Sequence, residues 1–265
     1  MIFSNPTIFV GYDPREHDAY RVLEYTAHTQ SSKVINVYPI RQDVMRRMGL
    51  YRRAWMLGSS HLPEQTTEDD RWSRDMFDKR PFATDFSFTR FLVPFLNRLE
   101  GWALYMDCDM FFREDPIDLF ESYCDPKYAL YCVKHNHTQA SEEATKMYGN
   151  PQYQYSRKNW SSIMLFNCEH EAHNNLTVDD INTKPGRWLH NLQWLSDDVI
   201  GELPERWNWL DGHSSENINA DVVHFTRGGP WFKDHWNPLD EKSKQYGEEW
   251  EDCFNRYVKY LHTKL

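Results

Sequence analysis

Two aspartates interrupt a long apolar run, and this interruption is the feature that most constrains the fold. The run covers residues 102–112, with Asp107 and Asp109 near its centre. Strand-forming residues dominate both flanks, and an unpaired carboxylate in a buried strand costs much free energy. Because the two aspartates stand at i and i+2, extended backbone projects both to one side. Two hard oxygen ligands at a strand end suit a divalent cation such as Mg²⁺ or Mn²⁺, whereas the alternative is an ordinary turn.

The N-terminal residues predict a βαβ unit. Residues 7–12 and 33–40 read as strands, and 16–28 as a helix between them. Asp13 can cap that helix, with Pro14 at its first position. A parallel sheet with a right-handed crossover follows, and ligands of such sheets bind at the carboxyl edge. No Gly-x-Gly-x-x-Gly follows the first strand, so the dinucleotide-binding fingerprint is absent.

The rest of the chain continues to alternate between helical and extended patterns. Apolar spacing predicts helices over 42–57, 84–96, 187–195 and 240–265, and strands over 128–133 and 159–168. The first of these helices is basic, which indicates either a solvated face or a basic lip for a phosphorylated acceptor. Residues 58–82 are polar without a clear period, and we expect a long loop or insertion there.

Composition excludes several classes of protein. A formal net charge of -10 argues against nucleic acid as a partner, since a phosphate backbone requires a basic face. The 5 cysteines form no Cys-x-x-Cys pair, which disfavours a zinc site or a disulfide framework and favours a reducing compartment. We find no signal peptide and no apolar window long enough to span a membrane.

The stretch around Asp107 and Asp109 resembles the Asp-x-Asp motif of GT-A nucleotide-sugar glycosyltransferases, in particular the glycogenin-like and lipopolysaccharide galactosyltransferase-like family 8. In that family the two aspartates hold a Mn²⁺ that binds the donor diphosphate. Residues 221–232 resemble the family's "His-Phe-x-Gly-x-x-Lys-Pro-Trp", which makes His224 the expected third ligand. One imidazole beside two carboxylates favours Mn²⁺, with Mg²⁺ as the alternative.

The family lysine is missing from this glycine-rich turn, where Gly229 takes its place. Arg227 is expected to replace the missing charge. The backbone N–H groups of Gly228 and Gly229 are expected to approach phosphate.

Two further matches imply donor contacts. Residues 84–96 resemble "Ser-x-x-Arg-Phe-x-x-Pro", whose arginine approaches the diphosphate, so Arg90 is the candidate. The alternative is that Arg90 only bridges to Asp85. The turn after the first strand contacts base and ribose in the family, which implies this role for Tyr12 and Asp13, although Asp13 could be a plain N-cap.

The last two matches concern the donor sugar. Residues 159–168 resemble "Phe-Asn-Ser-Gly-aliphatic-Met-aliphatic-Phe-Asn", which places Asn159, Ser161 and Ser162 beside the sugar, with Ser162 in place of glycine. Residues 196–208 resemble "Asp-Gln-Asp-x-Leu-Asn" followed by "Leu-Pro-x-x-Trp-Asn". Asp198 then lies near the sugar hydroxyls, and Asp197 replaces the glutamine beside the reactive carbon. Either Asp197 brings a carboxylate to the β face of the sugar, or the register differs.

The resemblance implies one GT-A-like α/β domain over 1–265, with a mixed, mostly parallel sheet flanked by helices. It implies sugar transfer from a nucleotide donor, a UDP-sugar, to an acceptor hydroxyl with retention of configuration. The acceptor class (glycan, lipid-linked or protein) stays open. We expect a cytoplasmic location, or a peripheral one at a membrane. The alternatives are a metal-dependent phosphohydrolase and a non-catalytic binding protein on a degenerate GT-A fold.

Overall fold

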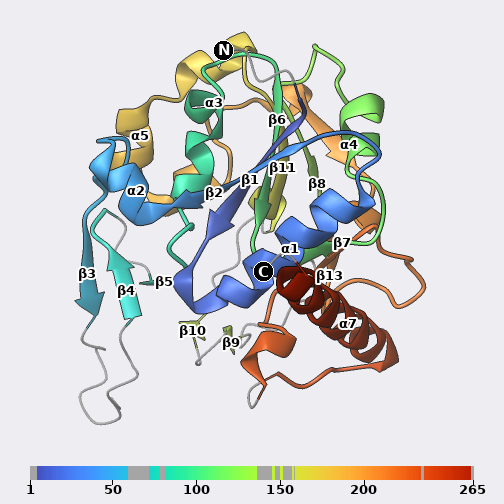
Figure 1. Cartoon of the computed structure of the whole chain (residues 1–265). Helices are drawn as coiled ribbons and strands as arrows, with labels where there is room; N and C mark the ends of the chain where they lie inside the picture. Colours follow the sequence, from blue (N-terminus) through green and yellow to red (C-terminus); the bar gives the residue numbers. More distant parts are fainter. Residues whose placement is uncertain are drawn as a thin grey trace.

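A six-stranded sheet forms the centre of the protein, in the order β12-β8-β11-β6-β1-β2 (Figure 1). The computed structural model describes residues 5–58, 72–77, 81–135, 145–146, 150–151, 157, 159–233 and 236–263. The sheet strands are β1 (Thr7–Tyr12), β2 (Asn36–Arg41), β6 (Trp102–Asp107), β8 (Leu130–Val133), β11 (Ile163–Asn167) and β12 (Ile200–Leu203). Only β11 runs against the other five. The predicted mixed, mostly parallel sheet is therefore confirmed.

The βαβ unit at the N-terminus is present as predicted. The helix α1 (His17–Gln30) connects β1 to β2, which pair in parallel. A 3₁₀ turn, η1 (Pro14–Glu16), precedes the helix, and the Asp13 carboxylate accepts a hydrogen bond from the Arg15 backbone N–H at 2.9 Å. The capping role of Asp13 and the early position of Pro14 are confirmed, and together they turn the chain at the carboxyl end of β1.

Both faces of the sheet are buried, because alternate residues of each strand enter different cores. Leu104 and Met106 pack with α1, whereas Ala103 and Tyr105 pack on the opposite side. The elements on that opposite side are η2 (Thr89–Leu92), α3 (Val93–Leu96), α5 (Val178–Thr183) and α6 (Gly186–His190). The helix α4 (Ile117–Ser122) packs with the α1 side. The sheet is thus the middle of three layers.

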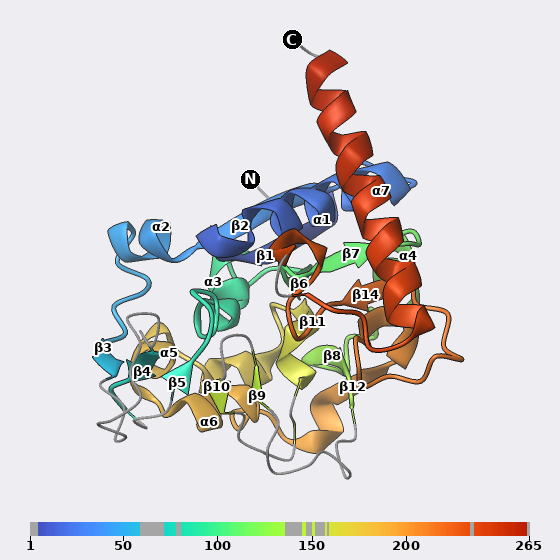
Figure 2. The ribbon, with the colours of Figure 1, turned by 90° about the horizontal axis from the view of Figure 1, so that it is seen from below.

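A small second sheet lies beside the carboxyl end of β6. It consists of β7 (Met110–Phe112), β13 (Trp209–Leu210) and β14 (Val222–His224), in the order β13-β14-β7. The helix α7 (Glu241–Thr263) packs on this sheet and against α1, and its C-terminal turns extend beyond the rest of the molecule (Figure 2). The predicted closing helix over 240–265 is present. Because β14 pairs with β7, a late segment of the chain is held next to the turn after β6.

The remaining described elements are short. They are η4 (Trp160–Ser162), η5 (Glu171–Asn175), η6 (Asp197–Val199), η7 (Glu205–Asn208), η8 (Pro230–Phe232), β9 (Thr145–Lys146) and β10 (Asn150–Pro151). Within the described ranges, no helix has the length and apolar character needed to cross a bilayer. The cytoplasmic location stays a prediction.

The prediction for residues 42–82 was wrong in two respects. The helix α2 ends early (Gln42–Arg47), and residues expected to be helical form β3 (Trp55–Gly58) instead. The expected loop contains β4 (Trp72–Asp75) and β5 (Pro81–Phe82), which pair with β3 in a three-stranded antiparallel sheet. Residues 59–71 and 78–80 of that loop lie outside the described residues.

A buried ion pair explains this departure. The Arg53 guanidinium donates to both Asp75 oxygens at 2.8 Å, and both side chains are 1% exposed. Arg53 also donates to the backbone oxygens of Ile181 and Lys184, beside α5. A solvated face was therefore the wrong expectation for Arg53. Its partners come from distant segments, which no local periodicity can indicate.

Two other predicted helices are shorter than expected. Residues 84–96 form turns followed by η2 and α3. Only α6 is helical in the segment predicted over 187–195, and Leu192 beyond it has a φ of 52°. A positive φ at a leucine ends a right-handed helix.

Candidate metal and donor site

Three potential ligands converge at the carboxyl end of β6. Asp107, Asp109 and His224 each offer one ligand atom, and these atoms all lie within 4.8 Å of one another. Asp107 ends β6, Asp109 lies in the turn before β7, and His224 ends β14. His224 pairs in register with Met110, which brings its Nε2 to 3.3 Å from Asp109 Oδ1. The structure therefore brings together the three residues that the sequence indicated as metal ligands.

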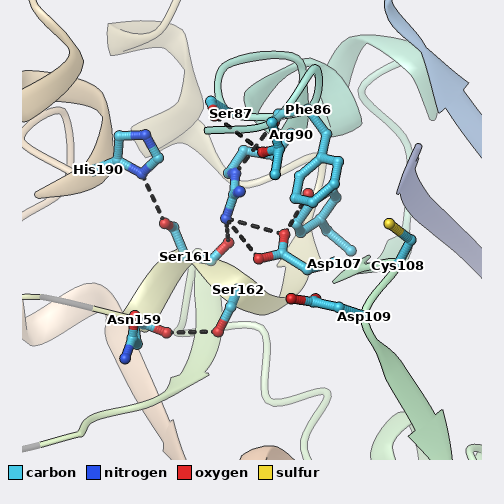
Figure 3. Close-up of polar contacts among 12 residues, drawn as sticks. Phe86, Ser87, Arg90, Asp107, Cys108, Asp109, Asn159, Ser161, Ser162 and His190 are labelled. Carbon is cyan, nitrogen blue, oxygen red and sulfur yellow. Dashed lines mark hydrogen bonds and ion pairs between the residues drawn. The ribbon is translucent and has the colours of Figure 1, made fainter. Parts of the chain in front are cut away.

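Asp107 is held from two sides. The Tyr105 hydroxyl donates to its Oδ1 at 2.7 Å, and Arg90 Nη1 lies 3.1 Å from the same oxygen (Figure 3). Burial raises the pKa of the Asp107 carboxyl, an effect that the Arg90 guanidinium opposes and the neighbouring Asp109 reinforces. A divalent cation would favour the ionised carboxylates, so the donor set and its charge fit such an ion.

The ring of His224 has a defined partner on its other side. His224 Nδ1 lies 2.9 Å from Asn208 Oδ1, and both side chains are buried. This leaves Nε2 directed toward Asp109. Metal-binding histidines commonly use one ring nitrogen for the metal and donate from the other to an acceptor. The imidazole thus also fits a metal ligand. Sequence analysis gave Asn208 no role, since its only signal is its place in the "Leu-Pro-x-x-Trp-Asn" match.

Arg90 lies where the sequence predicted, next to the candidate ligands. Its side chain is buried, and Nη1 donates to the Ser161 carbonyl at 2.8 Å as well as to Asp107 at 3.3 Å. Arg90 therefore does more than bridge to Asp85. It connects β6 with the start of β11, and it keeps a positive charge beside the two aspartates.

The segment before β11 approaches the same place. Asn159 has a φ of 64°, and Ser161 and Ser162 follow it in η4. Ser161 Oγ lies 3.0 Å from His190 Nδ1 at the end of α6 (Figure 3). Sequence analysis missed His190, because a lone histidine in a helix carries no motif. It adds a second imidazole beside the segment that the resemblance assigned to the donor sugar.

Asp197 and Asp198 lie away from this cluster. They form η6 just before β12, whose first residue Ile200 is in register with Leu130 at the start of β8. Because β12, β8 and β6 run in the same direction, η6 lies at the amino edge of the sheet, opposite the carboxyl edge that carries Asp107. Both side chains are exposed, and Asp197 pairs with Arg157. Their expected place beside the donor sugar stays a prediction, and the structure puts them at the edge of the sheet opposite Asp107.

Both oxygens of the Asp13 carboxylate accept hydrogen bonds from neighbouring groups of the protein. Its Oδ1 accepts from the backbone N–H and Nε of Arg15, and its Oδ2 accepts from Arg15 Nη2 and the Asp85 N–H. Its side chain is 1% exposed. Tyr12 is half-buried below the Arg41 guanidinium, 5.2 Å from the ring centroid. Tyr12 is therefore better placed than Asp13 to meet a ligand at this edge.

The turn after His224 is also held by internal contacts. Arg227 Nη2 donates to the fully buried Asp211 at 3.1 Å, and Ser243 of α7 donates to the same carboxylate. Gly228 has a φ of 89°, and a Cβ on Gly229 would lie 2.2 Å from the Trp231 ring. Backbone conformation and packing thus account for both glycines, and Arg227 anchors the turn to α7.

The fold and this cluster define the class of the protein. It is an α/β protein with the GT-A fold, and a candidate metal site lies at the carboxyl edge of its sheet. The solved galactosyltransferase LgtC, in complex with donor and acceptor sugar analogues, has a TM-score of 0.53 and 10% identity, over 94% of this chain and 95% of LgtC. The glycosyltransferase GlyE of Streptococcus pneumoniae also has a TM-score of 0.53, at 15% identity. This second match covers 97% of this chain and only 64% of GlyE.

The sequence itself shows the family. The chain is 38% identical to Protein CDI of Arabidopsis thaliana over 257 residues, which cover 95% of this chain and 87% of that protein. The chain therefore belongs to the family of Protein CDI. No protein-family model matches the sequence. The expected membership of family 8 stays a prediction.

Proposed function

We propose that the protein transfers a sugar from a nucleotide-activated donor, a UDP-sugar, to an acceptor hydroxyl. The observation that carries the proposal is the convergence of Asp107, Asp109 and His224 at the carboxyl edge of a GT-A fold. Open α/β sheets bind their ligands at this edge. Two solved structures with a similar fold, GlyE and LgtC, are glycosyltransferases, and LgtC was solved in complex with donor and acceptor sugar analogues.

The three ligands would hold Mn²⁺, whose Lewis acidity stabilises negative charge on a leaving diphosphate. Arg90 keeps a buried guanidinium beside Asp107, where it can donate to diphosphate oxygens once they displace a carboxylate contact. The Ser161 carbonyl accepts a hydrogen bond from Arg90, and Asn159 lies two residues earlier at the start of η4; we assign both residues to the donor sugar. Tyr12, at the carboxyl end of β1, is assigned to the nucleoside. Retention of configuration, and the action of 1–265 as one domain, belong to the same proposal.

One observation favours a second candidate, a non-catalytic nucleotide- or sugar-binding protein. Transfer requires positive charge at the diphosphate, the family lysine is absent, and Arg227 is paired with Asp211. Arg90, which lies 3.1 Å from Asp107, is then the arginine that this proposal places at the diphosphate. A binding protein would retain the metal and nucleotide but not turn over.

Donor hydrolysis tests the proposal without knowledge of the acceptor. UDP release is measured over a panel of UDP-sugars, with Mn²⁺ and with EDTA, for the wild type, Asp109→Ala and Asp198→Ala. We expect Mn²⁺-dependent release from one sugar, lost in Asp109→Ala and unchanged in Asp198→Ala, whose side chain is exposed at the opposite edge. Binding of Mn²⁺ and UDP without release, even with candidate acceptors, would favour the second candidate. Absence of both binding and release would refute both.

A further inference from the structure

A directional series of hydrogen bonds connects Asn159 to the ring of His224. The Ser162 hydroxyl donates to the Asn159 carbonyl at 2.8 Å. Asn208 Nδ2 donates to Ser162 Oγ at 2.9 Å, and Asn208 Oδ1 lies 2.9 Å from His224 Nδ1. Ser162, Asn208 and His224 are 3%, 0% and 4% exposed, so bulk water does not compete for these groups.

The direction of the series is set at its first member. A backbone carbonyl can only accept, so the Ser162 O–H must donate to Asn159 and its lone pairs are left to accept. The Asn208 amide then turns its NH₂ toward Ser162 and its oxygen toward His224. Of the two acceptors that face the ring, Asn208 Oδ1 lies 2.9 Å from Nδ1, nearer than Asp109 Oδ1, which lies 3.3 Å from Nε2. In the neutral imidazole we therefore expect the proton on Nδ1 and the lone pair on Nε2.

We propose that Ser162 and Asn208 are positioning residues that select the Nδ1–H tautomer of His224 and so present its Nε2 lone pair to the metal site. The proposal rests on the proposed function for the identity of the ion. The proposal also gives a role to Ser162, which stands where the "Phe-Asn-Ser-Gly" pattern of family 8 has glycine. A glycine would leave the Asn208 amide without this acceptor and without a preferred orientation.

The tautomer can be observed directly in the metal-free protein. Long-range ¹⁵N–¹H correlation spectra are recorded at pH 8 for the wild type, Ser162→Ala and Asn208→Ala. The His224 signal is assigned by its loss in His224→Gln. We expect the Nδ1–H tautomer in the wild type and a shift toward the Nε2–H tautomer in both alanine variants.

The affinity for Mn²⁺ gives a second readout that needs no donor. Loss of the partner of a metal-bound histidine weakens metal binding about 10- to 100-fold, which is the expected loss for Asn208→Ala. Ser162→Ala should fall between the wild type and Asn208→Ala, because the amide can still meet His224 in one of its two orientations. Melting temperatures identify any variant that fails to fold.

The double variant Ser162→Ala/Asn208→Asp separates positioning from packing. A carboxylate presents an accepting oxygen in either orientation, so this variant no longer needs Ser162. We expect it to restore the Nδ1–H tautomer and to bind Mn²⁺ at least as tightly as Ser162→Ala. A merely structural role of Ser162 would not be rescued in this way.

Two results would overturn the proposal: an Nε2–H tautomer in the wild type, or an unchanged His224 signal in folded Ser162→Ala and Asn208→Ala proteins. If the wild type bound no Mn²⁺, the metal-dependent function would fail. The tautomer spectra would still decide whether Ser162 and Asn208 orient the ring.

Discussion

Asp109 and His224 belong to distant parts of the chain, yet Oδ1 of the first lies 3.3 Å from Nε2 of the second. The pairing of β14 with β7 produces this contact, since it fixes His224 opposite Met110. With Asp107 on the end of β6, the arrangement concentrates two carboxylates and one imidazole in a buried corner. Such a corner is costly without a cation, which makes metal binding measurable as stability.

Saturating Mn²⁺ should raise the melting temperature of the wild type. A ligand at 100 times its Kd stabilises the folded state by about 2.7 kcal/mol if it does not bind the unfolded chain. Asp109→Asn should lose most of this increase, because it removes one charged ligand. Asp198→Asn is the matched control and should retain it, since its carboxylate is exposed at the other edge of the sheet. An equal Mn²⁺ response in all three proteins would place the ion elsewhere. Differential scanning fluorimetry suffices for the comparison.

Arg227→Gln should reduce stability and leave the KM for the donor unchanged. The variant removes a hydrogen bond to the buried Asp211 carboxylate, and such charged bonds contribute about 1.5–3 kcal/mol. Arg47→Gln is the control, because Arg47 and its partner Asp43 are 70% and 50% exposed and their pairing should contribute little to stability. Urea unfolding and donor kinetics check both values. A raised KM at unchanged stability would show instead that Arg227 contacts the diphosphate.

Breaking the buried Arg53–Asp75 ion pair should lower the free energy of unfolding far more than breaking an exposed ion pair. Arg53→Met leaves Asp75 charged and buried, and removal of one partner of a buried pair costs about 3–5 kcal/mol. Arg52→Met removes an exposed partner of Asp179 and should cost about 0–1 kcal/mol. The double variant Arg53→Met/Asp75→Leu should recover part of the loss, since no lone charge remains. Equal unfolding free energies for Arg53→Met and Arg52→Met would contradict this expectation.

Acid should destabilise the fold through His173. Burial lowers the pKa of this imidazole from 6.5 to about 4, while its Nε2 lies 3.0 Å from the Ala129 carbonyl. Between these two values the unfolded chain binds a proton that the folded protein does not, so the free energy of unfolding falls as the pH falls from 6.5 toward 4. At pH 5 the loss from this group is about 2 kcal/mol relative to pH 8.

Urea unfolding of the wild type and His173→Gln at both pH values measures this contribution. The difference between pH 8 and pH 5 should be smaller in the variant, which has no imidazole to protonate. If both proteins lost the same free energy between the two pH values, the acid sensitivity would lie in other groups.

The sequence was sufficient for features that depend on local pattern. The βαβ unit and the Asp13 cap follow from local pattern, and the pairing of Asp107 with Asp109 on one side follows from the strand that leads into them. His224 was indicated by the resemblance to the family motif, and the structure brings it to the two aspartates through the pairing of β14 with β7. Predictions from local pattern depend only on the position of a residue along one strand or helix.

Features that depend on distant partners could not be predicted. Arg53 lies in a segment predicted as a basic helix, and its partner Asp75 comes from a separate strand. The pairing of Arg227 with Asp211 likewise joins two segments whose proximity no local pattern indicates. The position of Asp197 at the opposite edge of the sheet depends on the placement of β12 beside β8, which a short acidic motif does not indicate. His190 was overlooked because only the fold brings α6 to Ser161.

The antiparallel pairing of β14 with β7 also has a consequence for biosynthesis. His224, a candidate ligand, and the helix α7 that packs on β14 are synthesised long after β6, Asp107 and Asp109. Asp107 and Asp109 therefore lack the neighbouring imidazole of His224 until most of the polypeptide has been translated. A nascent chain arrested before residue 222 would carry both carboxylates and still lack His224, so the candidate ligand set is complete only late in translation.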